Sequence, residues 1–125
     1  PIIGIAAGAV CYLAVQLKNK MKWDDALDVW GVHGIGGVLG SILLGVFASK
    51  AINGAGADGL IFGNAAFLGK QVVAVVSASL YAFIFTYIML IVINWITPVK
   101  VDEHTEKMGL DAAIHGEQAY DEGAL

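Results

Sequence analysis

The chain has 125 residues, of which 58% are hydrophobic and 14% charged, and its formal net charge is −4. This apolar share exceeds that of ordinary soluble domains and, together with long apolar stretches, indicates a single membrane-embedded domain. The acidic residues gather after residue 98, which disfavours nucleic-acid binding. The one cysteine, Cys11, excludes a disulfide framework and a cysteine metal site within the chain.

The first apolar stretch covers residues 2–17 and contains Gly4 and Gly8 at the spacing that lets helices pack closely in lipid. At about 1.5 Å per residue it reaches only about 24 Å, short of the roughly 30 Å bilayer core. Pro1 stands where a Met would begin a whole protein, and no charged cap precedes the stretch. We therefore expect the sequence to start inside a helix of a longer protein.

A charged loop is expected next, with Lys18, Lys20 and Lys22 followed by aspartates. By the positive-inside rule this loop is cytoplasmic. Asp25 and Asp28 are predicted to cap the following helix and to place negative charge at its positive end.

The second membrane helix is predicted over residues 28–48, with His33 in its first third. At 3.6 residues per turn His33 shares a face with Trp30, Gly36, Gly37 and Gly40. Because these glycines allow close helix packing, the ring is expected to point at a protein interior, where an ionisable side chain indicates function. Two other readings stay open: a histidine satisfied by a backbone carbonyl, and a haem ligand, for which this sequence offers no second membrane histidine.

A glycine-rich external loop and a third membrane helix over residues 68–95 complete a membrane part, residues 1–97. Pro98 ends this helix. A cytoplasmic tail, residues 98–125, follows. In it a short helix with Glu103 and Lys107 four residues apart is predicted to end at Gly109, and Asp111 is predicted to cap one further turn that closes at Gly116.

Two stretches, DDALDVWGVHGIGGVLGSILLGVFA at residues 24–48 and GLDAAIHGEQAY at residues 109–120, together resemble the ammonium transporter family (Amt/Mep/Rh) in its bacterial and archaeal form. The resemblance implies an all-α membrane protein of eleven helices, of which this carboxyl-terminal part holds the last three. It also implies homotrimers in the cell membrane, ammonium or ammonia as substrate, and a cytoplasmic carboxyl terminus.

The resemblance also assigns roles to residues. His33 matches the second of two pore histidines, whose partner lies on a helix outside this sequence, and Asp28 matches an acidic residue at the start of the pore helix. The tail would contact cytoplasmic loops and a PII-type signalling protein. Its matching residues are Gly109, Leu110, Asp111, His115, Gly116, Glu117 and Tyr120.

No cofactor or metal is expected, and no enzyme, because the sequence offers no nucleophile and base pair, no paired buried carboxylates and no metal-ligand cluster. Two alternatives to a channel remain: an ammonium sensor or docking module that acts through the tail, and a redox membrane subunit.

Overall fold

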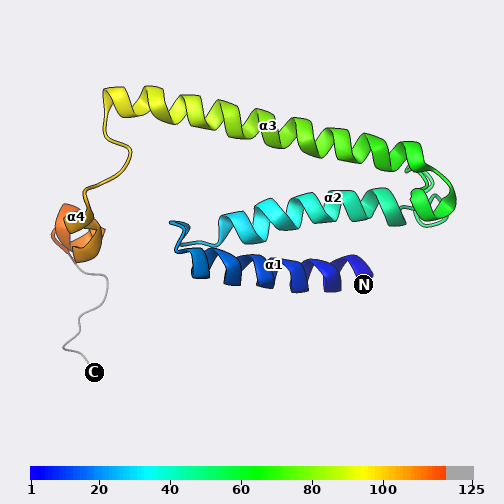
Figure 1. Cartoon of the computed structure of the whole chain (residues 1–125), viewed down its shortest axis with the longest axis horizontal. Coiled ribbons are helices and arrows are strands. Elements are labelled where there is room, and N and C mark those ends of the chain that lie inside the picture. The colour runs from blue at the N-terminus through cyan, green and yellow to red at the C-terminus, as the bar shows by residue number, and fades with distance from the viewer. Residues whose placement is uncertain (118–125) are drawn as a thin grey trace. The chain divides into compact units, whose positions relative to one another are not determined.

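The computed structural model describes residues 1–117, and in that range every regular element is helical. The long helices are α1 (Ile2–Met21), α2 (Gly36–Phe47), which continues directly from the π-helix η1 (Trp30–Ile35), and α3 (Ala65–Ile96) (Figure 1). The short ones are the 3₁₀ turn η2 (Leu60–Phe62), α4 (Glu103–Met108) and the π-helix η3 (Asp111–His115). Ile2–Met21, Trp30–Phe47 and Ala65–Ile96 are long and apolar enough to cross a membrane, so the all-α membrane prediction is confirmed.

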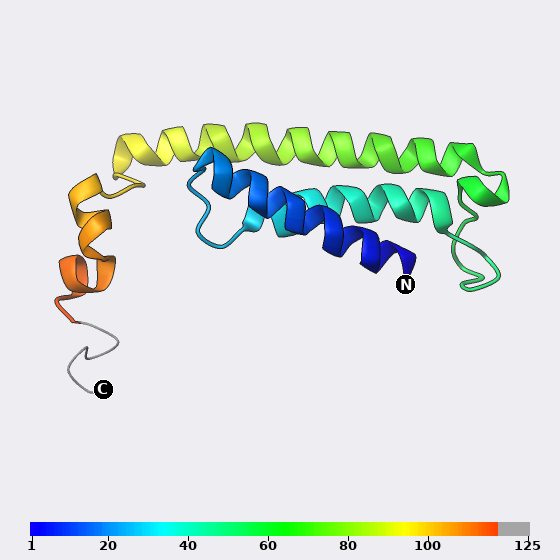
Figure 2. The same cartoon turned by 60° about the horizontal axis from the view of Figure 1, so that its bottom comes forward.

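The chain divides into two compact units, residues 1–81 and the residues from 82 onward. In the first unit α1 runs obliquely across η1 and α2 (Figure 2). The two elements approach closely at glycines: a Cβ on Gly31 would lie 2.9 Å from Val15 Cγ2, and one on Gly36 would lie 3.0 Å from Cys11 Sγ. Small residues therefore permit this crossing, as is typical of helices in lipid.

Helix α1 continues past Leu17 to Met21, so Lys18 and Lys20 lie in its last turn rather than in a loop. Cationic side chains there interact favourably with the negative end of the helix dipole. The helix ends at Lys22, whose φ of 55° is left-handed and whose amide donates to the carbonyl of Asn19. The lysine-rich stretch thus ends a helix, and the connection to η1 is shorter than the sequence suggests.

The second predicted helix begins in the expected place but is not uniform. Its first part, η1, is a π-helix, in which hydrogen bonds join residues five apart, and an α-helix follows from Gly36. Asp28, just before it, has a φ of 56°. Nothing in the apolar periodicity predicts this change of winding.

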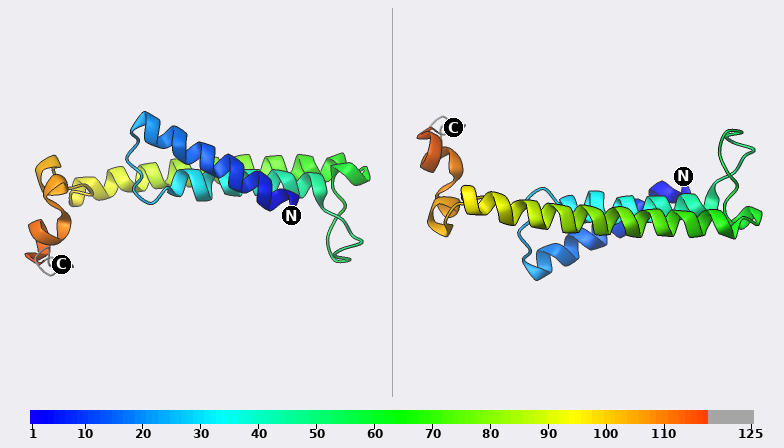
Figure 3. Two further views of the ribbon diagram at one scale, coloured as in Figure 1. Left: turned by 90° about the horizontal axis from the view of Figure 1, so that it is seen from below. Right: turned by 90° about the horizontal axis from the view of Figure 1, so that it is seen from above.

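The connector between α2 and α3 is an irregular loop that projects from the helices of the first unit (Figure 3). The amide of Gly59 closes it by donating to Ala48 O at 2.8 Å. The side chain of Asn64 accepts from the amide of Phe67 at 3.1 Å, which explains why α3 begins at Ala65 rather than at residue 68. Gly45 lies against Leu68: a Cβ added to Gly45 would lie 3.1 Å from the Cα of Leu68. The end of α2 and the first turn of α3 are therefore in contact.

In the second unit, α4 is capped by Asp102, whose carboxylate accepts from the amides of His104 and Thr105 at 3.0 Å each. Gly109 and Gly116 end α4 and η3 with φ of 88° and 68°, values that glycine adopts without steric cost. The short helix that ends at Gly109 and the further turn that closes at Gly116 are therefore present, the latter with π winding. The prediction that Asp111 caps this turn is wrong: Asp111 is the first residue of η3, the N-cap is Leu110, and no side chain caps it. Tyr120 lies outside the described residues.

The described residues bury little apolar surface among themselves. Across residues 1–117, Ala14 is the one apolar side chain that is buried, and most of the large apolar side chains of α3 are exposed. Apolar surface of this extent indicates contact with lipid or with other protein.

Candidate functional site

His33 lies inside η1, and its side chain is exposed in the first unit. Among residues 1–117, no hydrogen bond or ion pair joins its ring to another group. The ring is therefore open to groups that come from beyond this chain. π-Helical turns occur frequently at functional sites, which makes this segment the first place to look for one.

Asp25 holds the beginning of η1. Its two carboxylate oxygens accept from the amides of Val29 and Trp30 at 2.9 Å each. These bonds, that from Trp30 first, lower the pKa of the Asp25 carboxyl below its ordinary value. The carboxylate is therefore charged at neutral pH and satisfies helix amides that have no partner within the helix.

The prediction that Asp28 also caps this helix is wrong: the first amides bond to Asp25, and the Asp28 carboxylate faces Lys18 instead. Lys18 Nζ lies 2.6 Å from Asp28 Oδ1 and donates to the backbone carbonyl of Asp25 at 2.6 Å. Among the described residues this buried carboxylate oxygen has no partner with hydrogen-bond geometry, so the lysine charge is what balances it. Asp28 thus pairs with α1, and its backbone carbonyl accepts from Val32 at 2.9 Å.

We define the α1–η1 junction as residues 18–36. Besides the lysine contacts, the rings of Trp23 and Trp30 meet edge to face with centroids 5.0 Å apart. Gly31 is buried against Val15, a contact that the sequence reasoning missed. No signal in the sequence singles out this glycine, because Gly31 and Gly36 are five residues apart and do not form the four-residue pair typical of α-helical packing.

The three glycines predicted to pack differ in their surroundings. Gly36 faces Cys11 of α1, whereas Gly37 and Gly40 have no atom within 4 Å of an ideal Cβ in the described part of the chain. A packing role for Gly37 and Gly40 therefore stays a prediction about contacts outside it.

The tail residues Gly109, Leu110, Asp111, His115, Gly116 and Glu117 form a short surface at α4 and η3. Leu110 is 48% exposed, and the side chains of Asp111, His115 and Glu117 are exposed as well. The amide of Glu117 donates to the carbonyl of Asp111 at 3.3 Å, which folds the end of η3 back on itself. Their regulatory role stays a prediction.

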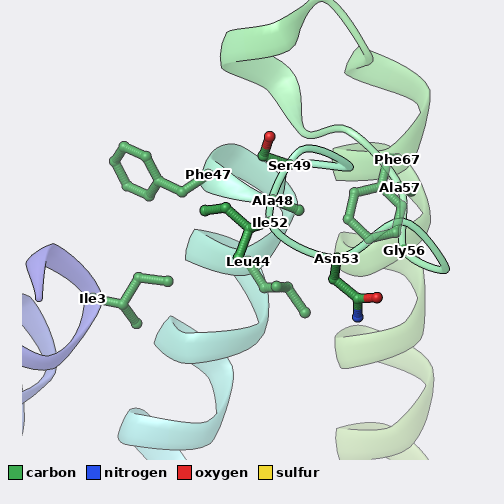
Figure 4. A pocket seen from close by; sticks show the side chains of 10 residues that line it. All are labelled: Ile3, Leu44, Phe47, Ala48, Ser49, Ile52, Asn53, Gly56, Ala57 and Phe67. Atoms are coloured by element: carbon green, nitrogen blue, oxygen red, sulfur yellow. The ribbon is translucent and has the colours of Figure 1, made fainter.

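A cavity of about 370 Å³ lies where the connector meets α2 and the beginnings of α1 and α3 (Figure 4). Its polar side chains are those of Ser49 and Asn53, and no charged side chain lines it. The other lining residues are Ile3, Leu44, Phe47, Ala48, Ile52, Gly56, Ala57 and Phe67. It therefore offers no counter-charge for a cation. Within residues 1–117 no three His, Cys, Asp or Glu side chains are grouped to hold a metal ion.

Comparison with known proteins shows which family this chain resembles. A family model described as "Ammonium Transporter Family" matches residues 1–120. The chain is 46% identical over 120 residues to the "Ammonium transporter" of Bacillus subtilis (strain 168), covering 95% of the chain and 30% of that protein. It is 42% identical over 119 residues to "Ammonium transporter Amt1" of Archaeoglobus fulgidus, covering 95% and 30%. To "Ammonium transporter 1" of Dictyostelium discoideum it is 42% identical, covering 94% and 26%.

The three apolar helices and these relatives define an α-helical membrane protein of the transporter class. More particularly, the chain belongs to the ammonium transporter family. The chain spans about 30% of the length of the Bacillus subtilis and Archaeoglobus fulgidus proteins. The relatives give no support to the two alternatives, a redox membrane subunit and an ammonium sensor or docking module that acts through the tail.

Proposed function

We propose that this chain forms the carboxyl-terminal part of an ammonium or ammonia channel and that His33 lines its conduction path. The observation that carries the proposal is an exposed imidazole on an otherwise apolar membrane-spanning helix. An ionisable side chain facing lipid is costly, so such a ring is expected to face protein or a polar passage. The family of the chain supplies the substrate class.

The chemistry of ammonium explains why a histidine suits this position. Moving a bare ammonium ion into a medium of low dielectric constant costs tens of kcal/mol, whereas neutral ammonia crosses with little penalty. A neutral imidazole offers one donor and one acceptor, so His33 can share a hydrogen bond with a second ring and still present a polar edge to ammonia. The second ring would come from outside residues 1–125.

Orientation and assembly belong to the same proposal. The lysines around the α1–η1 junction support a cytoplasmic position for that end, and by this topology the tail is cytoplasmic in a cell-membrane protein.

We also propose a homotrimer and a PII-type protein that docks on residues 109–125. Loss of PII-type binding when that segment is deleted, with transport retained, is the expected result; unchanged binding would remove this part.

The function is tested by replacing the matching residues of the Bacillus subtilis relative with this chain and measuring methylammonium uptake in cells that lack their own ammonium transporters. We expect uptake by the chimera. His33→Ala should reduce it about tenfold, which corresponds to about 1.4 kcal/mol at the barrier. His104→Ala, in the exposed helix α4, is the matched histidine control and should leave uptake unchanged. Equal uptake by the His33→Ala chimera and its parent would remove the pore role.

A further inference from the structure

We propose that Lys18 is a positioning residue for His33: held between the carbonyl of Asp25 and the carboxylate of Asp28, its ammonium group fixes the winding of η1 and so the direction of the imidazole. This inference rests on the proposed conduction role of His33. It concerns a residue of α1, the helix that packs across η1 (Figure 2).

Lys18 differs from the other lysines of its turn in burial. It is 7% exposed, whereas Lys20 and Lys22 are exposed. A buried ammonium group is unfavourable unless it is paired and hydrogen-bonded, and Lys18 Nζ makes two contacts of 2.6 Å. Lys18 therefore links α1 to the turn that follows through a hydrogen bond and an ion pair, and it is not a solvated surface charge.

The two contacts hold both ends of the turn that starts η1. One is to the backbone of Asp25, whose carboxylate caps the amides of Val29 and Trp30. The other is to the side chain of Asp28, whose φ of 56° is unfavourable for a residue with a Cβ. Such backbone conformations persist only where surrounding contacts impose them, and Lys18 supplies that contact.

The winding of η1 decides where His33 points. Gly31 is fixed against Val15 on α1, and the sulfur of Cys11 lies 3.8 Å from the carbonyl of Val32. A change from π to α winding between these contacts and α2 would rotate the imidazole about the helix axis, because each α-helical residue turns by about 100°. Release of the turn by loss of Lys18 permits that change.

The activity test uses the chimera described above with Lys18→Met, Asp28→Asn, the double variant, and Lys20→Met as the control. Transport is divided by the amount of folded protein in the membrane, and the ratio of methylammonium to ammonium transport is recorded. We expect Lys18→Met to lower transport per molecule at least fivefold and to change the ratio. Lys20→Met should change neither, because its side chain is exposed.

The double variant separates positioning from folding. Asp28→Asn leaves the buried Lys18 ammonium without its counter-charge, and Lys18→Met leaves the half-exposed Asp28 carboxylate without its lysine. The double variant removes both charges and should restore the amount of folded protein. If Lys18 positions His33, the double variant still has an altered ratio. If Lys18 only stabilises the fold, the double variant transports as the parent does, and the proposal is overturned.

The rate of a disulfide cross-link measures the winding of η1 independently of transport. The ideal Cβ of Gly36 lies 3.0 Å from Cys11 Sγ, so Gly36→Cys should form a disulfide with Cys11 under mild oxidation. Adding Lys18→Met should slow this cross-link at least fivefold, and adding Lys20→Met should not. An unchanged cross-linking rate together with an unchanged transport ratio overturns the proposal. A parent chimera that folds but does not transport overturns the channel function instead, and the cross-link then still decides the role of Lys18.

Discussion

The α1–η1 junction and the tail segment from Asp102 to Glu117 share an aspartate cap and a π-helix, but they differ in the contacts that hold these elements. In each, an aspartate accepts hydrogen bonds from the first amides of a helix, and each contains a π-helix. At the junction, the sequence-distant residues Val15 and Lys18 of α1 pack on the turn and on η1. In the tail, the partners of Asp102 lie two and three residues away.

This difference separates what a cap does from what packing does. A cap satisfies helix amides and fixes where a helix begins, but it leaves the helix free to move with its segment. The contacts from α1 fix η1 against a second helix, which is what the proposed conduction role of His33 requires. The cap of α4 in the tail comes from a neighbour in sequence.

The largest expected effect comes from filling the closest packing contact of the junction. In Gly31→Ala the new Cβ would lie 2.9 Å from Val15 Cγ2 and 3.2 Å from Val15 N, so α1 and η1 must separate. Overpacking of this kind typically costs about 1–3 kcal/mol. Thermal unfolding of the purified transporter in detergent measures it, with Gly37→Ala as the control, since no described atom lies within 4 Å of that Cβ. Equal losses from both changes would contradict the packing described.

A smaller effect is expected from removing the cap of η1. Asp25→Ala deletes the acceptor of the Val29 and Trp30 amides but leaves the backbone carbonyl that Lys18 contacts. Those two amides should then exchange with solvent faster, while the unfolding temperature changes less than in Gly31→Ala. Hydrogen exchange read by mass spectrometry measures this. Asp25→Asn keeps a single acceptor oxygen, so one of the two amides should stay close to the parent and the other should exchange faster. Exchange of both amides as fast as in Asp25→Ala would show that charge rather than capping matters.

The smallest effect is confined to the tail and depends on pH. Hydrogen bonds from the amide and hydroxyl of Thr105 lower the pKa of Asp102 below its ordinary value of 3.8. Since the folded pKa is the lower one, the cap stabilises α4 fully above pH 3.8 and loses that contribution as pH falls through the folded pKa. The amide signals of His104 and Thr105, followed by NMR, should shift in that range. Asp102→Asn should abolish the dependence; its persistence would assign the titration to another group.

The predictable parts of the chain are those with local signals. Apolar length predicts the three spans, and the Glu103–Lys107 spacing with Gly109 and Gly116 predicts the tail helices, because these signals act within a few residues. The Asp102 cap is not predicted. The carboxyl end of α1 lies four residues later than predicted and the beginning of α3 three residues earlier, owing to the lysines of the last turn and to Asn64. His33 is recognisable as an ionisable residue in an apolar span.

The missed features depend on contacts between segments. Lys18 has the same sequence context as Lys20, and only the crossing of α1 over η1 buries one and exposes the other. Gly31 is likewise indistinguishable from Gly34 until Val15 is placed against it. Neither periodicity nor composition contains that information, so the tie between α1 and the histidine helix emerges only in three dimensions.

The π winding of η1 also bears on changes in chain length. A π-helical turn holds more residues than an α-helical turn, so the segment from Trp30 to Ile35 carries surplus backbone. Removing one residue there would convert the turn to ordinary α winding, whereas one deletion inside α2 or α3 would turn every following side chain to another face. A variant one residue shorter in this region would therefore keep both flanking contacts while turning the His33 ring to another direction. Shortening, and not only substitution, thus gives access to the proposed conduction role.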